Sequence, residues 1–220
     1  MGRRGSSRPR TTSPTATRWV RGAAVATAAW LATMVGPGAS HAQAQSAPQS
    51  PVEVVRARNQ AVERILAAAG DSVDAPTKEQ LKDVINGLID FPELSQRALS
   101  RHWDARTEQE RVDFTGVFRE LIRNSSVRKL GVYRADSVTY RPPEAAGDSV
   151  TVVTIAYKDG KSAEIEYRMH QAGDEWKAHD VVVDGSSTVR TYRDSFNKEI
   201  SRGSYEAMYA KLVDRLKQDS

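Results

Sequence analysis

Three histidines and one carboxylate are the side chains with which acid–base chemistry could begin. They are His102, His170 and His179, with Asp180 directly after His179. A hydroxyl nucleophile needs such a base within hydrogen-bond reach. Because successive residues of a strand point to opposite faces, His179 and Asp180 cannot pair if they lie on one strand. Asp180 alone could still act as the buried general base of a small exported isomerase-like enzyme.

Other signatures of catalysis or cofactor binding are missing from the sequence. It holds no H-E-x-x-H, G-x-S-x-G, P-loop or dinucleotide-binding glycine pattern. It also has no cysteine, which excludes disulfides, thiolate metal sites and cysteine nucleophiles. The histidines are isolated and the carboxylates lack calcium-loop spacing. We therefore expect no metal, no cofactor and no catalytic residue.

The charge of the chain is divided unevenly. Of its 32 basic residues, six arginines lie in residues 1–42, which contain no acidic residue, so the remainder carries 26 basic against 28 acidic residues. Because this body is slightly acidic, we expect no nucleic-acid partner.

The first 42 residues have the three zones of a secretory signal peptide. A basic start precedes an alanine-rich apolar run from Gly22 to about Val35, and Ser40-His41-Ala42 matches a cleavage site. The run is too short for a membrane anchor, which needs about 20 apolar residues. We predict a signal peptide over 1–42, a flexible tether over 43–51, one domain over 52–220, and export of the mature protein.

Hydrophobic periodicity predicts helices in the first half of this domain and at its C-terminus. Apolar stripes with caps indicate helices over 55–69, 77–89, 92–101, 107–122, 189–200 and 204–216. Between them, period-two patterns predict strands over 132–141, 149–157, 161–170 and 175–183, with Asp159-Gly160 as a hairpin turn. The fold class is therefore α+β, with N- and C-terminal helices on one face of a four-stranded antiparallel sheet.

The turns also predict the register of these strands. A two-residue loop at Asp159-Gly160 places Val152 opposite Tyr167 and Val150 opposite Met169. A four-residue loop over 171–174 then places Met169 opposite Trp176. This register predicts that His179 faces Glu166 on the polar side of the sheet, and it puts the following set on one apolar face: Val150, Val152, Thr154, Ala156, Ala163, Ile165, Tyr167, Met169, Trp176, Ala178, Asp180 and Val182. An acid on such a face needs a partner, and we expect Asp180 to pair with Arg193.

Two long runs carry a resemblance to a known family. They are FPELSQRALSRHWDARTEQERVDFTGVFRELI over 91–122 and EWKAHDVVVDGSSTVRTYRDSF over 175–196. In order and spacing this pattern resembles the MlaC family, also called toluene-tolerance auxiliary proteins. The matching residues are Phe91, Leu99, Trp103, Thr107, Phe114, Phe118, Leu121, Trp176, Asp180, Gly185, Ser187, Tyr192, Arg193 and Phe196. The chain departs from the pattern at Ser100, where glycine is usual, at Ser126, where tyrosine is common, and at Ser186, where an aliphatic residue is normal.

The resemblance implies a periplasmic phospholipid shuttle. Such a protein would exchange phospholipid with an inner-membrane ABC transporter/MCE complex and an outer-membrane lipoprotein complex, and would maintain the lipid asymmetry of the outer membrane. It would be a carrier and not an enzyme. A structural or chaperone-like exported protein remains a further alternative.

Small residues on the predicted sheet face would leave volume for lipid tails between sheet and helices. Helix side chains could equally fill this volume, and only the resemblance favours a cavity. We predict that the tails contact Phe114, Phe118, Leu121, Ile122, Val150, Val152, Thr154, Ala163, Ile165, Tyr167, Met169, Val189 and Tyr192. The predicted structural residues are Asp180, Gly185, Ser187 and Arg193.

Overall fold

The computed structural model describes residues 50–70, 72–128 and 134–219. The predicted signal peptide and most of the predicted tether lie outside these residues. Helix α1 begins at Pro51, capped by Ser50, so the last two residues of the predicted tether belong to its start. The helices are α1 Pro51–Ala69, α2 Ala75–Asn86, α3 Phe91–Leu99, the short 3₁₀ helix η1 Ser100–His102, α4 Glu108–Ser126, α5 Thr188–Arg202 and α6 Tyr205–Asp219.

Local capping chemistry explains where most of these helices begin. Thr107 and Glu110 form the predicted reciprocal capping box of α4, and the carboxylate of Asp90 caps α3. The predicted start of α2 was wrong. Its cap is Asp74, whose carboxylate accepts the N–H of Thr77, so the helix begins one turn earlier.

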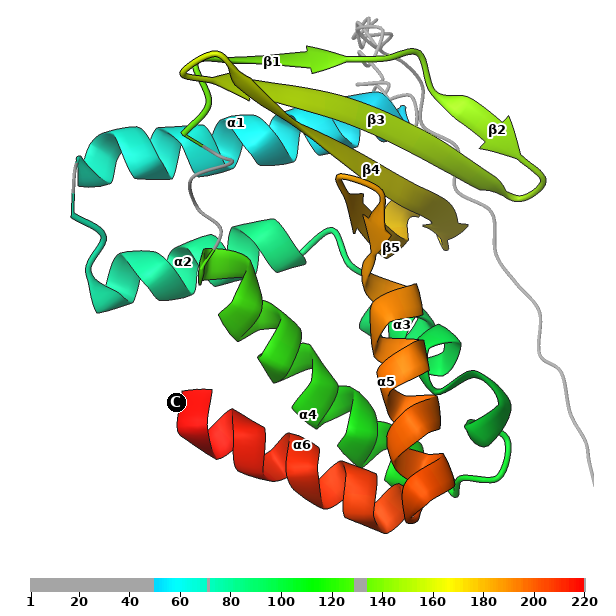
Figure 1. The fold of residues 1–220 in the computed structure, drawn as a ribbon. Coiled ribbons are helices and arrows are strands. Elements are labelled where there is room, and N and C mark those ends of the chain that lie inside the picture. The colour runs from blue at the N-terminus through cyan, green and yellow to red at the C-terminus, as the bar shows by residue number, and fades with distance from the viewer. Residues whose placement is uncertain (1–49, 71, 129–133, 220) are drawn as a thin grey trace, which may run out of the picture. The chain divides into compact units, whose positions relative to one another are not determined.

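The strands form one antiparallel sheet in the order β1-β3-β4-β5-β6, with β2 also beside β3 (Figure 1). Their bounds are β1 Ser137–Tyr140, β2 Glu144–Ala146, β3 Ser149–Lys158, β4 Lys161–Ala172, β5 Glu175–Val183 and β6 Ser186–Ser187. The mixed helix and antiparallel-sheet class is confirmed. The predicted count of four is wrong, because β2 and β6 are too short to give a period-two signal in the sequence.

The first hairpin has the predicted register. Val152 pairs with Tyr167 and Val150 with Met169. Asp159 and Gly160 both have positive φ, 49° and 71°, as the tight turn between β3 and β4 requires.

The second hairpin, between β4 and β5, does not have the predicted register. Its turn has two residues, Gly173 and Asp174, and Met169 pairs with Ala178 instead of Trp176. A β-bulge follows: Arg168 pairs with Asp180, which leaves the intervening His179 without a partner in the register. Beyond the bulge, every side chain of β5 lies on the face opposite to the predicted one.

This bulge redistributes the side chains of β5. Val181 and Val183 pair with Tyr167 and Ile165, and so share their apolar face. Asp180 and Val182 therefore lie on the other face. The prediction that Asp180 and Val182 lie on the apolar face was therefore wrong. The predicted pairing of His179 with Glu166 was also wrong, because Glu166 pairs with Val182.

The buried side chains form three apolar clusters, one of which joins the sheet to α1. α1 runs along the sheet in Figure 1, and its Val55 packs with Val152 and Met169. α3 to α6 form a second core of their own, which contains Phe114, Phe118, Phe196 and Met208 among others. α1 and α2 share the third, around Val62, Leu66 and Leu81. The space between the second core and the apolar sheet face is where the candidate site lies.

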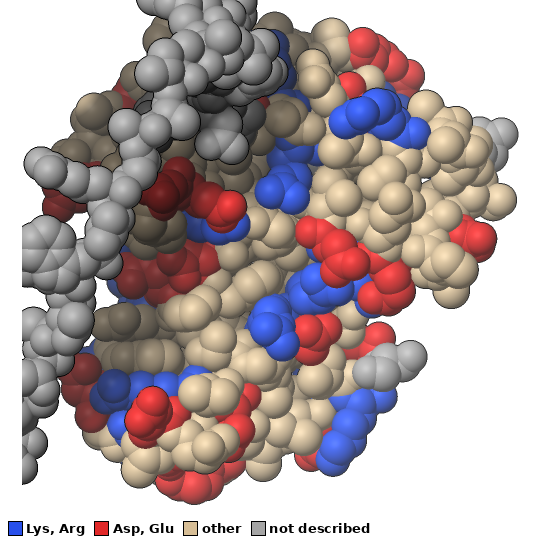
Figure 2. Space-filling view, turned by 180° about the vertical axis from the view of Figure 1, so that it is seen from behind, with Lys and Arg blue, Asp and Glu red and all other residues tan. Residues whose placement is uncertain are grey.

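The charged side chains are interspersed over the face that Figure 2 shows. Basic and acidic residues lie next to one another there, with uncharged surface between them. This mixture fits the nearly balanced charge of the body of the chain.

Candidate functional site

A pocket of about 480 Å³ lies between the apolar sheet face and the helices. We call it the sheet–helix pocket. Its size is within the range of about 300–1,000 Å³ that is typical of small-ligand sites. It is lined by Ile85, Asn86, Leu88, Ile89, Leu94, Ile122, Ser125, Ser126, Ile165, Tyr167, Val181, Val183, Ser186, Thr188, Thr191 and Tyr192.

The sheet side of this pocket depends on the bulge in β5. Ile165 and Tyr167 come from β4, and Val181 and Val183 come from β5 opposite them. Without the extra residue at His179, Asp180 and Val182 would take the positions of these valines. The bulge thus places valines against the pocket and a carboxylate behind the sheet.

The helix side is held by aromatic packing. Tyr192 of α5 lines the pocket, and its ring lies edge-on to the ring of Phe118, with centroids 4.7 Å apart. Burial raises the pKa of the Tyr192 hydroxyl, which therefore stays protonated at neutral pH. This wall presents an aromatic ring and neutral hydroxyls to a ligand.

One end of the pocket is polar. The amide Nδ2 of Asn86 donates to the carbonyl oxygen of Lys82 at 2.7 Å and to Oγ of Ser126 at 3.0 Å. Asn86 is 2% exposed, and its Oδ1 has no hydrogen-bond partner among the described residues. A buried acceptor without a partner costs about 1–3 kcal/mol. The polar side chains of Asn86, Ser125 and Ser126 nevertheless give this part of the pocket its hydrogen-bonding groups.

The predicted tail-binding residues are distributed over several places. Ile122, Ile165, Tyr167 and Tyr192 line the sheet–helix pocket. The helical core holds Phe114, Phe118, Leu121 and Val189, and the core beneath α1 holds Val150, Val152 and Met169. Thr154 is buried beside a much smaller cavity, and the half-buried Ala163 lies opposite Ala156 at the far end of the hairpin.

Reasoning from the sequence missed several lining residues. Val181 and Val183 were not included in the predicted apolar face, because the bulge in β5 was not foreseen. Leu88 and Ile89 belong to the short connection between α2 and α3. The backbone of this connection pairs with β5 through reciprocal bonds between Ala178 and residues 88 and 90. The apolar run at the end of α2 was the only signal, and it indicated a helix stripe.

The junction between β5 and α5 is organised by Asp180. Its carboxylate accepts Oγ–H of Ser187 at 2.6 Å and N–H of Val189 at 3.0 Å, and it lies 3.3 Å from Nη1 of Arg168. The expected pairing of Asp180 with Arg193 was therefore wrong, because the nearer cation comes from the neighbouring strand. The only ion pair of Arg193 among the described residues is with Asp194, at 3.9 Å.

Ser187 and Gly185 shape the same junction. Oγ of Ser187 accepts the N–H of Arg190 at 3.0 Å and so caps α5. Gly185 has a φ of 76°, which side-chain-bearing residues rarely adopt. In the structure, Ser187 is thus a helix cap and Gly185 a turn residue.

The two C-terminal histidines lie behind the sheet. Nε2 of His170 is 3.0 Å from Oδ2 of Asp90, and the rings of His170 and His179 meet edge-on at 5.5 Å. Burial, with Arg97 and His170 nearby, lowers the pKa of His179 to about 4, so it is neutral at physiological pH. In the part of the chain that the structure describes, no three potential ligands gather into a metal site.

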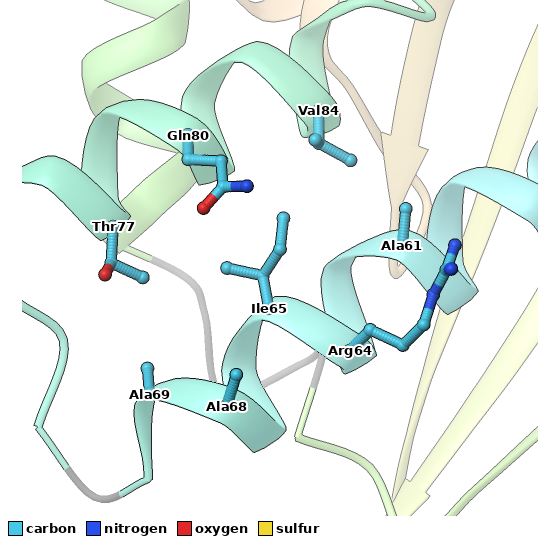
Figure 3. A pocket seen from close by; sticks show the side chains of 8 residues that line it. All are labelled: Ala61, Arg64, Ile65, Ala68, Ala69, Thr77, Gln80 and Val84. Carbon is cyan, nitrogen blue, oxygen red and sulfur yellow. The ribbon is translucent and has the colours of Figure 1, made fainter.

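A second hollow lies between α1 and α2 (Figure 3). We call it the α1–α2 groove. Alanines at 61, 68 and 69 line the α1 side, and Ile65 points across toward Gln80 and Val84 of α2. The groove has little polar lining, and we assign it no ligand. Across residues 50–70, 72–128 and 134–219, no helix combines the length and the hydrophobicity that spanning a bilayer requires.

Comparisons with known proteins agree with this architecture. A solved structure from Ralstonia solanacearum matches with a TM-score of 0.67 and 24% sequence identity, over 78% of this chain and 99% of that one. It is described as a phospholipid-binding protein in complex with a phospholipid. No match was found among curated proteins. The family model of the MlaC protein matches residues 56–214, which is most of the chain, and the chain therefore belongs to the MlaC family.

Proposed function

We propose that this protein binds a phospholipid by its acyl chains in the sheet–helix pocket. The observation that carries this proposal is the lining of the pocket, where aliphatic side chains of β4 and β5 face Ile122 and Tyr192 of the helices. Membership of the MlaC family and the lipid-bound relative from Ralstonia solanacearum support it.

Acyl chains in water need such a container for a simple energetic reason. Each exposed CH₂ costs about 0.8 kcal/mol, so two chains of some 30 methylenes cost on the order of 20 kcal/mol. A dry slot between sheet and helices removes this cost without nucleotide, metal or nucleophile. The polar end of the pocket at Asn86, Ser125 and Ser126 is suited to the glycerol or head-group portion of the lipid.

We further propose that the bound lipid is carried across the periplasm. The carrier would exchange it with an inner-membrane ABC transporter/MCE complex and an outer-membrane lipoprotein complex, and so contribute to outer-membrane lipid asymmetry. This part rests on family membership and on the leader-like residues 1–42. Mass analysis of the secreted protein should find a start near Gln43.

A carrier accounts for the geometry better than an isomerase-like enzyme does. Asp180, the best candidate for a general base, does not line the sheet–helix pocket. Its oxygens already accept hydrogen bonds from Ser187 and Val189, which gives the carboxylate a structural task.

Mass spectrometry of organic extracts tests the binding function directly. The protein is purified from cells without detergent and extracted, and the extract is compared with one from an unrelated exported protein purified in parallel. We expect intact phospholipid in near-stoichiometric amount from this protein only. Extracts without phospholipid, from protein that is folded by circular dichroism, would contradict the proposal.

A further inference from the structure

A third hollow, of about 470 Å³, lies on the other side of the β5–α5 junction from the sheet–helix pocket. We call it the arginine pocket. It is lined by Arg97, Ser100, Arg168, His179, Asp180, Ser187, Val189, Arg190 and Arg193. The two pockets share no lining residue, because β5 and α5 turn different side chains toward each of them.

Four guanidinium groups line this pocket from three elements. Arg97 belongs to α3, Arg168 to β4, and Arg190 and Arg193 to α5. The side chains of Arg97, Arg168 and Arg193 are 41–45% exposed, so their charges are accessible to a ligand. Chain segments far apart in sequence thus bring like charges together, and an anion bound between them would lower their mutual repulsion.

Most acidic residues near these arginines lie outside the pocket lining. Asp180 is the one acid in the lining, and it is 3% exposed and occupied by Ser187 and Val189 as well as Arg168. Outside the lining, Arg97 pairs with Glu93 at 2.7 Å, Arg168 also pairs with Glu166 at 3.4 Å, and Asp194 lies 3.9 Å from Arg193. The lining itself thus presents four arginines and one acid to the pocket.

His179 supplies a second, independent observation. The residue is 6% exposed and lines the pocket, and its Nδ1 is buried with no hydrogen-bond partner among the described residues. Buried polar atoms are nearly always satisfied, so this nitrogen needs a partner that the described residues do not supply. The backbone N–H groups of Val189 and Arg190 are already used by Asp180 and Ser187, so recognition falls to the side chains.

We propose that the arginine pocket is a binding site for a phosphate group, recognised by Arg97, Arg168 and Arg193, with His179 beside them. A phosphate monoester presents three non-bridging oxygens and up to two charges, and the phosphodiester of a lipid head group presents two non-bridging oxygens and one charge. In both, the oxygens are arranged tetrahedrally, so guanidinium groups can donate from several directions at once, whereas the two oxygens of a carboxylate lie in one plane. The phosphate could belong to a soluble ester or to the head group of a lipid in a membrane surface.

Two binding measurements separate these sources. Inorganic phosphate and glycerol 3-phosphate are titrated into the purified protein and followed by calorimetry or by NMR shifts of the arginine side chains. Vesicles of phosphatidylcholine, with and without phosphatidylglycerol, are tested by co-sedimentation. Saturable binding of the soluble phosphates alone identifies a soluble ester, whereas vesicle binding that requires phosphatidylglycerol and is displaced by phosphate identifies a head group.

Substitutions tie the binding to this pocket. Arg193→Gln and Arg97→Gln should each weaken phosphate binding about tenfold or more, since a hydrogen bond to a charged group contributes about 1.5–3 kcal/mol. Arg119→Gln is the matched control, because Arg119 is 51% exposed on α4 and outside the pocket. It should bind phosphate like the parent protein, and all three variants should keep the thermal midpoint and the co-purified lipid of the parent.

Several outcomes would overturn the proposal. They are the absence of saturable phosphate binding in both assays, equal weakening by Arg119→Gln, or binding of an acidic peptide where phosphate fails. Absence of co-purified phospholipid from the parent protein would instead contradict the proposed lipid binding in the sheet–helix pocket. The two proposals can therefore be contradicted independently.

Discussion

Ser187 and Asp180 are joined by a 2.6 Å hydrogen bond in which the hydroxyl donates to the carboxylate. The same hydroxyl accepts the N–H of Arg190, while the other carboxylate oxygen accepts the N–H of Val189. The Asp180 side chain thus accepts one backbone N–H of the first turn of α5 directly and holds the Ser187 hydroxyl that accepts another. Since α5 carries residues of both pockets, this pair fixes their geometry.

We expect Asp180→Asn to destabilise the protein. An amide replaces one acceptor oxygen by a donor group, which leaves either Ser187 or Val189 without its acceptor and Arg168 with Glu166 as its remaining counter-ion. The expected loss is about 2–4 kcal/mol in the free energy of unfolding, measured with urea. Asp194→Asn is the control, since its side chain is 69% exposed, and it should change little. Equal stability of Asp180→Asn and the parent would show that the junction does not depend on this carboxylate.

Ser100→Gly should stabilise the protein. Ser100 has φ 49° and ψ −123°, a conformation that strains residues with a side chain, and it stands where glycine is usual in the family resemblance. Relief of the strain, less the greater entropy of glycine in the unfolded chain, should leave a gain of about 1 kcal/mol by urea denaturation. Ser100→Ala keeps the strain and removes only the hydroxyl, so a gain with alanine would contradict the explanation.

Two glycine substitutions should have opposite signs. Gly185→Ala places a Cβ at φ 76° in the turn before β6 and should cost about 1 kcal/mol. Gly116 lies inside α4, where an added Cβ meets no atom within 4 Å, so Gly116→Ala should gain about 0.5–1 kcal/mol. Thermal midpoints of the two variants, compared with the parent, check both signs. A loss at position 116 or a gain at 185 would show that contacts, not backbone preference, dominate there.

The β-bulge at His179 is the main feature of the sheet that the sequence did not predict. The Asp159-Gly160 turn fixed the first hairpin, because this dipeptide accepts positive φ at both positions. The predicted register of the second hairpin was wrong. Its two-residue turn at Gly173-Asp174 and its bulge at His179 do not change the alternation of apolar residues in the sequence. That one extra residue moved Val181 into the pocket and Asp180 out of it. The family motifs include Asp180 and Ser187 but do not tell which arginine pairs with Asp180.

The free energy of unfolding should fall as the pH drops through the range in which His179 is neutral in the folded protein but protonated in the unfolded chain. Its pKa is about 4 in the folded protein against 6.5 ordinarily, owing first to burial and then to Arg97 and His170, while Asp180 and Glu93 oppose the shift. Above about pH 6.5 both states are neutral and the contribution is complete. Between about pH 6.5 and 4 the unfolded chain gains the proton first, which lowers stability by up to about 3 kcal/mol.

Replacing this histidine tests the assignment of the pH dependence. His179→Gln should flatten the fall in unfolding free energy between about pH 7 and pH 5, measured by urea denaturation in a series of buffers. His179→Phe does not titrate either and must flatten it equally, whatever its stability at neutral pH. An unchanged slope in both variants would assign the effect to other groups.

Filling the sheet–helix pocket separates a ligand cavity from an imperfectly packed core. Val181 lines the pocket from β5, opposite Tyr167, and is partly exposed. In a cavity of about 480 Å³, the larger side chain of Val181→Trp should find room and displace bound phospholipid, with little change in the thermal midpoint of the delipidated protein. In a filled core the same change would overpack the interior and cost about 1–3 kcal/mol. Val112→Trp provides the control, because Val112 is 60% exposed on α4 and the variant should retain its lipid. Lipid content is measured by mass spectrometry of organic extracts from the three proteins. A Val181→Trp protein that is folded and still holds the parent's full amount of phospholipid would show that the tails lie elsewhere.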